Sequence, residues 1–488
     1  MRNQARFAWT ALLLLSLAAS AQNSQGTWDP AGWIGDLHLI KQTLLTKYAN
    51  LQWLTEDRQV NLDALFADTE ARIRASGSDA GARAALDRLI RRIDDGHVQI
   101  DWPNALPSTT AKTQATLDAP AFCSSIGYIE KPGVANVAAQ LPSFVPLQGS
   151  PQFPSGTIAV GGHRVGFLRI EVFMPQFTPK LCVDAVRELK VPTNVECKDA
   201  CQDKIESFAY REMTNALEED LRQLSAAGAD LLMLDLTRNG GGSEWAEAVA
   251  RMFTSRRLQS EKLGFVRGAH WQKHWTELAK QLSLAAQSAS PTDATQLRAW
   301  ATEADQAALV ASTPCSYGSQ CTWLGITGYS TGLVGEADSS QFLGKPWGQL
   351  VFSPAEYTYR DAVWTKPLVV LVDQGTASAA EEFTAILQDD HAAVIAGSRT
   401  LGAGCGHTDG GTPTLLPHSG ATLEVPDCAR LRADGSNEVL GIFPDVLIPW
   451  RNDDGPRLKT RLLEQSLPSI VQRALAGSTT AVPDSKGR

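Results

Sequence analysis

Apolar residues in the first hundred positions recur with the spacing of a helix. The stretches DLHLIKQTLLTKYANL and AALDRLIRRIDDGHV place apolar side chains three and four residues apart, which is typical of one buried helix face. The pattern predicts a helical N-terminal domain over residues 22–100 that ends near Gly96 and His97. Residues 101–156 are rich in Pro, Ser, Thr and Ala, and we expect a linker of short strands and loops there.

Shorter apolar runs follow and predict the strands of an α/β (α+β) core. In TIAVGGHRVGFLRIEVF two β-rich runs meet at Gly161-Gly162, as in a hairpin. LLMLD, residues 231–235, is apolar enough for a buried parallel strand and leads into Gly240-Gly241-Gly242. KPLVVLVDQGTASAAEEFTAILQDD repeats the order of strand, turn of small residues and helix.

These segments predict a core in two pieces, residues 157–255 and 345–455. Between them, residues 256–344 hold a Gln/Ala/Ser-rich helical part and a loop bounded by cysteines, which we interpret as an insertion. A helix and a polar tail are expected over residues 456–488.

The chain begins with the pattern of an export signal. Arg2 and Arg6 precede an apolar run over residues 8–18 that ends in Ala-Ser-Ala, which predicts a signal peptide over residues 1–21. A membrane anchor is the alternative, but a spanning helix needs roughly 20 apolar residues. We therefore expect a periplasmic or secreted protein with no membrane span after signal removal.

The net charge bears on which partners the chain can bind, and the cysteine count bears on disulfides. The formal net charge of −9 becomes −11 without the two N-terminal arginines, and no long basic run occurs, which argues against nucleic acid as a partner. The oligomeric state is open. The eight cysteines all follow the signal, and an even number in an exported chain favours disulfides.

Two disulfide pairs are our guesses, because sequence does not fix connectivity: Cys315 with Cys321, and Cys405 with Cys428. The spacing Cys197-x3-Cys201 could also belong to a zinc site, but no second close pair with histidines completes one. We expect neither a metal nor a cofactor.

Ser378 is the candidate nucleophile. In GTASAAEEF it lies between a predicted buried strand and a helix, where free N–H groups at the helix start favour developing negative charge. A plain helix N-cap is the alternative. The motif is not Gly-x-Ser-x-Gly, so an α/β-hydrolase elbow is disfavoured.

The glycines at 240–242 form a second turn between a strand and a helix. Consecutive glycines allow close backbone approach and can present N–H groups to an oxyanion. A phosphate loop is disfavoured because no Gly-Lys-Ser/Thr follows, although an ordinary turn remains an alternative.

A serine nucleophile needs a base. No lysine occurs between Lys366 and Lys459, so a Ser-Lys mechanism lacks a candidate. His97 lies where the helical pattern ends and is a candidate base, although a histidine there can equally serve the helix end.

Six segments in order resemble the S41-type serine peptidases, which include C-terminal-processing, tail-specific and tricorn-like members. They are IDDGHV, VGFLRI, LDLTRNGGG, VVLVDQGTASAAEEFTAILQDD, GSRTLGAG and NEVLGIFPDV, and they span most of the chain from Ile93 to Val446. The resemblance implies a ClpP/crotonase-like core built from αββ units. Some members of the family carry a PDZ module, of which residues 101–156 give no clear sign.

The resemblance also implies roles for residues. The lysine of one branch would fall at Ala403, so this chain fits the histidine branch, with Ser378 as nucleophile, His97 as base and Glu438 as orienting carboxylate. Oxyanion donors would be the N–H groups of Ala379 and one of Gly240 or Gly241.

Tricorn-like members carry a serine just before the histidine, where this chain has Gly96. That difference implies that a water, or Asp94 or Asp95, connects Glu438 to His97.

The leading hypothesis is therefore a peptidase that forms an acyl-enzyme on a peptide or protein substrate. A catalytically silent protein of the same fold, binding an apolar ligand or peptide, is the alternative from another class. An esterase or transacylase would use the same residues.

Overall fold

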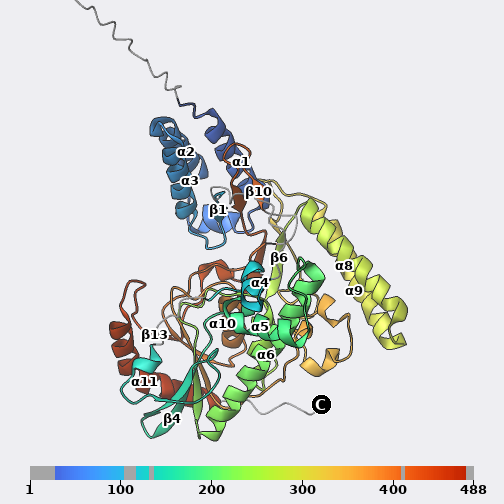
Figure 1. Cartoon of the computed structure of the whole chain (residues 1–488). Helices are drawn as coiled ribbons and strands as arrows, with labels where there is room; N and C mark the ends of the chain where they lie inside the picture. Colours follow the sequence, from blue (N-terminus) through green and yellow to red (C-terminus); the bar gives the residue numbers. More distant parts are fainter. Residues whose placement is uncertain (1–27, 104–116, 131–136, 408–412, 480–488) are drawn as a thin grey trace, which may run out of the picture.

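The computed structural model describes residues 28–103, 117–130, 137–407 and 413–479 (Figure 1). The predicted signal peptide, residues 1–21, and the end of the predicted tail, residues 480–488, lie outside the described residues. Among the residues it does describe, none of the helices has the length and apolar character needed to cross a membrane.

A seven-stranded mixed sheet forms the centre, in the order β13-β9-β8-β5-β4-β3-β2. Its strands from β4 through β13 pair in parallel, whereas β2, β3 and β4 are antiparallel. The strands are β2 (Val145–Pro146), β3 (Ser155–Val160), β4 (His163–Arg169), β5 (Leu231–Asp235), β8 (Leu368–Val372), β9 (Val394–Gly397) and β13 (Val446–Leu447). The hairpin predicted around Gly161-Gly162 is confirmed as β3–β4.

Both faces of this sheet are covered by helices, which explains the continuous apolar runs of its parallel strands. In β5, Leu232 and Leu234 join a core with α6, α7 and α10, while Leu231 and Met233 join a core with α11. This alternation follows from the two-residue period of a strand. The helices involved are α6 (Asp199–Ala226), α7 (Trp245–Met252), α10 (Ala379–Asp389) and α11 (Pro456–Thr479).

The N-terminal helices pack against a segment, residues 414–424, that comes much later in the chain. Strand β1 (Gln99–Asp101) pairs with β11 (Thr422–Glu424), which pairs with β10 (Thr414–Leu415). Leu416 and Leu423 share a core with α1 (Ala31–Lys47), α2 (Leu62–Ser76) and α3 (Asp79–Ile93). The pairing places the chain after His97 beside the chain after the loop 402–407.

A third sheet, β12-β6-β7, connects residues 256–344 to this arrangement. It contains β6 (Lys262–Val266), β7 (Leu324–Tyr329) and β12 (Cys428–Leu431). The predicted helical part is a hairpin of α8 (Ala269–Ser288) and α9 (Pro291–Ala311), which pack along their length and are yellow in Figure 1. Trp271 and Trp275 anchor its base against Phe265 of β6.

The expectation of only strands and loops over residues 101–156 is wrong in part, because α4 (Ala119–Ser125) is a helix. Asp118 caps it by accepting the N–H of Ala121, and a proline stands in its first turn, where the missing N–H costs nothing. Its partner α5 (Pro179–Glu188) lies beside it. Short π and 3₁₀ helices complete the fold: η1 (Trp53–Asp57), η2 (Ala138–Gln140), η3 (Pro175–Phe177), η4 (Ser339–Phe342), η5 (Gly348–Leu350), η6 (Ser353–Glu356) and η7 (Glu438–Leu440).

The cysteines form four disulfides: Cys123–Cys182, Cys197–Cys201, Cys315–Cys321 and Cys405–Cys428. Both guessed pairs are therefore confirmed, and the Cys197 spacing is a disulfide. The described residues contain no cluster of three or more His, Cys, Asp or Glu suited to a metal ion.

Removing a disulfide should destabilise the protein according to the loop that it closes. Cys405–Cys428 separates its cysteines by 23 positions and Cys197–Cys201 by 4. Loop-closure entropy then predicts a loss of roughly 3 kcal/mol for Cys405→Ala/Cys428→Ala and roughly 2 kcal/mol for Cys197→Ala/Cys201→Ala. Urea unfolding of the two variants beside wild type measures the difference, and non-reducing peptide mapping should find all four links. An equal loss in both variants would contradict the entropic reasoning.

Candidate active site

Ser378 immediately precedes α10, at the end of the turn that follows β8. Its backbone has φ 55° and ψ −123°, a region that non-glycine residues rarely occupy and that costs of order 1–3 kcal/mol. The residue is half-buried. A strained serine at the start of a buried helix is held there by its surroundings, and such strain is concentrated at functional sites.

The glycine turn after β5 lies directly against this serine, because β5 and β8 are neighbouring parallel strands. Gly241 has φ +99°, and a Cβ on it would lie 2.7 Å from Ser378 Cβ and 2.8 Å from Ala379 N. Only glycine fits this approach without a shift of the backbone. The carboxyl ends of parallel strands are also where α/β proteins usually place their sites.

The N–H groups around Ser378 are unequal candidates for an oxyanion hole. Ala379 is the first residue of α10, so its N–H has no intrahelical acceptor. The N–H of Gly241 donates to Asn239 Oδ1 at 2.9 Å, and the Asn239 side chain is fixed by donating to Ile170 O at 3.0 Å. Of the two glycines considered from sequence, Gly241 therefore has its N–H already engaged, and Gly240 remains the candidate donor.

His97 is held by the loop that follows β9. Its Nδ1 lies 2.6 Å from Ala403 O and 3.0 Å from Cys405 O. Since a carbonyl oxygen only accepts hydrogen bonds, Nδ1 carries the proton and Nε2 is left as the basic nitrogen. The His97 N–H donates to Asp95 Oδ1 at 2.9 Å, which fixes the backbone as well.

Glu438 does not contact His97. Its Oε2 accepts a hydrogen bond from Arg430 Nε, and its Oε1 accepts none from any described residue. Burial raises the pKa of Glu438 to about 7, although Arg430 opposes the increase. The direct partners of the His97 imidazole are thus two backbone carbonyls rather than a carboxylate.

A polar chain nevertheless connects the neighbourhood of Glu438 to His97. Asn437 Nδ2 donates to Asn50 Oδ1 at 2.7 Å, and Asn50 Nδ2 donates to Asp95 Oδ2 at 2.9 Å. Asp95 then accepts the N–H of His97. Asp95, which the sequence analysis named as one possible link, does contact His97: its carboxylate accepts the backbone N–H of His97 but does not bond to the imidazole or to Glu438.

Glu381 unites the two halves of the site, and the sequence reading missed it. Its buried carboxylate accepts hydrogen bonds from Ser378 N (3.0 Å), Gly402 N (2.7 Å), Ala403 N (2.8 Å) and Thr400 Oγ1. A signal was present, because Ser378-x-x-Glu381 at a helix start is the spacing of a capping box.

Ser378 and His97 therefore share one site through the loop 402–405. Ala403 is bonded to Glu381 by its N–H and to His97 by its carbonyl. Among the described residues no hydrogen bond joins Ser378 Oγ to the imidazole, and catalytic hydrogen bonds are often formed only once substrate is bound.

The two lysines that bracket this part of the chain, Lys366 and Lys459, are both engaged elsewhere. Ala403 stands, buried, where the lysine of the other branch was expected. Lys366 donates to Ala229 O at 2.6 Å, before β8 begins and so at the end of that strand remote from Ser378. Lys459 is buried, and its ammonium group is engaged by Asp373 at 2.9 Å.

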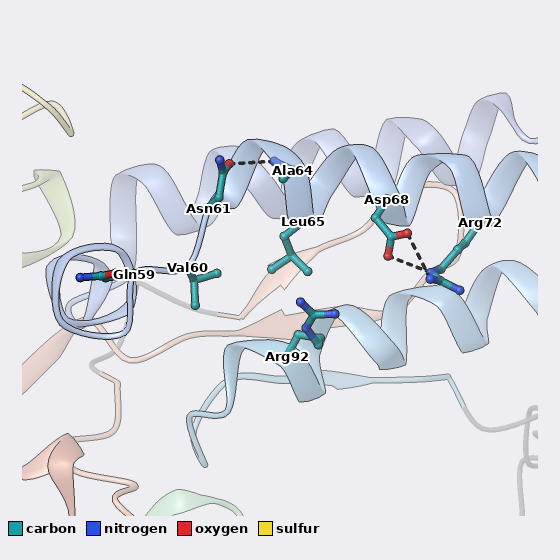
Figure 2. Close-up of a pocket in the computed structure, with 8 residues that line it drawn as sticks. All are labelled: Gln59, Val60, Asn61, Ala64, Leu65, Asp68, Arg72 and Arg92. Atoms are coloured by element: carbon teal, nitrogen blue, oxygen red, sulfur yellow. Dashed lines mark hydrogen bonds and ion pairs between the residues drawn. The ribbon is translucent and has the colours of Figure 1, made fainter.

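A pocket in the N-terminal helices lies apart from this site. Figure 2 shows it along α2 and α3, with Arg72 paired to Asp68 on its wall. Its lining residues are Gln59, Val60, Asn61, Ala64, Leu65, Asp68, Arg72 and Arg92. None of them holds Ser378 or His97, so we assign it no part in the chemistry.

A strained serine at a helix start, beside a glycine turn in a mixed α/β core, is typical of a serine hydrolase. The sequence model of peptidase family S41 matches residues 204–448, half of the chain, and the chain belongs to this family of peptidases.

Solved structures share the fold. Mature CPAF matches with a TM-score of 0.55 and 14% identity over 93% of this chain and 99% of the other. Its complex with lactacystin matches with a TM-score of 0.54 and 15% identity over 92% and 99%. A search of curated protein sequences found no match.

Replacing Gly241 with alanine should disrupt the site, whereas the same change at Gly240 should be far milder. The new Cβ at 241 would overlap Ser378 and Ala379, while a Cβ at 240 meets no atom within 4 Å. We expect Gly241→Ala to lower the rate at which a fluorophosphonate labels Ser378 about 100-fold and to cost roughly 1–3 kcal/mol of stability.

Labelling kinetics and thermal unfolding of both variants test this expectation. Equal labelling rates in Gly240→Ala and Gly241→Ala would show that the close approach has no role.

Proposed function

We propose that the protein is an exported serine peptidase that cleaves peptide bonds through an acyl-enzyme on Ser378, with His97 as the general base. The observation that carries the proposal is the double attachment of the loop 402–405. One attachment, through Glu381, fixes the nucleophile backbone, and the other, through two carbonyls, fixes the tautomer of the base. Membership of the S41 peptidases supports a peptide or protein substrate.

In the proposed reaction, Ser378 Oγ attacks the carbonyl carbon of the scissile peptide as its proton passes to His97 Nε2. The negative oxygen that forms accepts hydrogen bonds from the N–H groups of Gly240 and Ala379. Cleavage of the C–N bond releases the amine, which takes the proton from His97. Water then attacks the acyl carbon as it gives a proton to His97, and His97 returns that proton to Ser378 Oγ when the ester C–O bond breaks and the acid is released.

The role of Glu438 in this scheme is indirect, because its carboxylate is bonded to Arg430. A buried carboxylate that is paired with Arg430 is better suited to positioning its neighbours than to contacting the imidazole of His97 directly. The carbonyls of Ala403 and Cys405 take the orienting role that a carboxylate has in other triads.

A fluorophosphonate probe tests the nucleophile and the base together. It should modify Ser378 in folded wild type, fail to do so in Ser378→Ala, and react about 1,000-fold more slowly in His97→Ala, because a general base contributes roughly 100- to 10,000-fold. His163→Ala is the matched control, since His163 is part-exposed beside the β3–β4 turn. Labelling of another residue, with Ser378 untouched, would refute the assignment.

A peptide library digested by wild type and by Ser378→Ala distinguishes the candidate activities. Cleavage by wild type alone supports a peptidase. Hydrolysis of esters without any peptide cleavage would favour an esterase, and binding of peptide without turnover would favour the silent binding protein.

Export predicts a processed N-terminus. Expression of the full chain in a bacterium with a periplasm should give a product that begins at Gln22, recovered in the periplasm or medium. Substituting glutamate for Arg2 and Arg6 together should impair processing, because the positive n-region is lost. An unprocessed chain starting at Met1 would argue for an anchor or for retention.

A further inference from the structure

Arg430 is a buried cation behind the catalytic serine. It lies in β12, is only 6% exposed, and donates four hydrogen bonds. Two go to carboxylates, from Nε to Glu438 and from one terminal nitrogen to Glu382 at 2.9 Å. The other two go from the second terminal nitrogen to the carbonyl oxygens of Ser378 (3.0 Å) and Gly404 (2.8 Å).

Those two carbonyls belong to the two segments that the chemistry requires. Ser378 has the strained backbone described above, and its N–H is already fixed by Glu381. Arg430 holds the carbonyl oxygen of the same residue. Gly404 stands between the two residues, Ala403 and Cys405, whose carbonyls accept the His97 proton.

We propose that Arg430 is a positioning residue of the active site, and that Glu438 acts on catalysis through Arg430 rather than by orienting His97. The inference rests on the proposed function. On this view one guanidinium sets the distance between the nucleophile and the loop that holds the base, because it is hydrogen-bonded to both.

The geometry requires an arginine. A guanidinium presents five N–H groups in a rigid plane, so it can bond two carboxylates and two carbonyls at once. The ammonium group of lysine has three donors around one atom and cannot reach all four acceptors. The carboxylates of Glu438 and Glu382, with Glu261 at 3.7 Å from Nε, compensate the buried charge.

The substitution Arg430→Lys tests the proposal, because it keeps the positive charge and removes the fork. We expect kcat on a cleaved peptide, and the rate of fluorophosphonate labelling at Ser378, to fall about 100-fold, as for a misplaced catalytic group. KM should stay within about threefold of the wild-type value, because in this proposal Arg430 does not contact the substrate.

Arg432→Lys is the matched control. Arg432 comes just after the same strand and donates to Gln388 Oε1 and Asp389 Oδ2, both at 2.9 Å, but not to the nucleophile or to the loop 402–405. Its kcat should change by less than about threefold. Equal losses in the two variants, or a loss in KM alone, would overturn the proposal.

Glu438→Gln provides a second test that does not depend on the folding of Arg430→Lys. The amide oxygen of glutamine can still accept from Arg430 Nε, so we expect kcat to fall by no more than about tenfold. A carboxylate that orients the catalytic imidazole costs about 10,000-fold when it becomes an amide. A loss of that size would assign Glu438 to His97 and overturn the inference.

The proposed function and this inference fail in different ways. Wild type that does not label at Ser378 refutes the peptidase mechanism. Wild type that labels at Ser378, with Arg430→Lys and Arg432→Lys reacting alike, refutes only the positioning role.

Discussion

The candidate active site depends on the hydrogen bonds that the carboxylate of Glu381 accepts. It accepts hydrogen bonds from Ser378 N and from three donors in residues 400–403. Through this one group, the strained turn after β8 is joined to the loop after β9, and through that loop to His97. Because the carboxylate is buried, its loss would leave several backbone N–H groups without an acceptor, each costing about 1–3 kcal/mol.

Arg430 and the glutamates around it are buried, and burying ionisable groups costs desolvation free energy. Three buried glutamates, Glu261, Glu382 and Glu438, surround Arg430, and burial raises the pKa of Glu382 to about 8 and that of Glu438 to about 7. Replacing buried ion pairs with apolar residues is often neutral or stabilising, so such a cluster is weak evidence for stability. The hydrogen bonds that Arg430 donates to the carbonyl oxygens of Ser378 and Gly404 join this cluster to both segments of the candidate site.

The loop 402–405 has no regular secondary structure, so its conformation depends on contacts with other segments. Glu381 holds its N–H groups, Arg430 holds the carbonyl of Gly404, and the Cys405–Cys428 disulfide joins it to β12. β12 in turn pairs with β6, from which the α8–α9 hairpin extends. The residues between the two core segments are thereby connected to the catalytic loop through a sheet.

The sequence by itself indicated most of the helices and strands and suggested the candidate reactive residues. Apolar and β-rich runs located the β3–β4 hairpin and the buried strands β5 and β8, because burial of one face or of both dictates which positions are apolar. Within residues 256–344 only a helical part was predicted, and its arrangement as two packed helices was not. The glycine turn was visible because glycine adopts backbone conformations that are closed to other residues, and the serine because its type is favoured at helix starts. The helix α4 was missed, since seven residues carry too little periodicity to outweigh the composition around them.

Only the tertiary structure decided which partners these residues have. Arg430, Glu261 and Glu382 carry no local signal, because an arginine on a short strand, a glutamate just before a strand and a glutamate on a helix are ordinary until packing buries them. The same is true of the bonds from His97 to Ala403 and Cys405, which join residues more than 300 positions apart. Sequence patterns record local conformation and burial, whereas the direction of a side chain across the core depends on how distant segments pack. For that reason the sequence pointed to Ser378 and His97, and the fold alone placed Glu438 against Arg430.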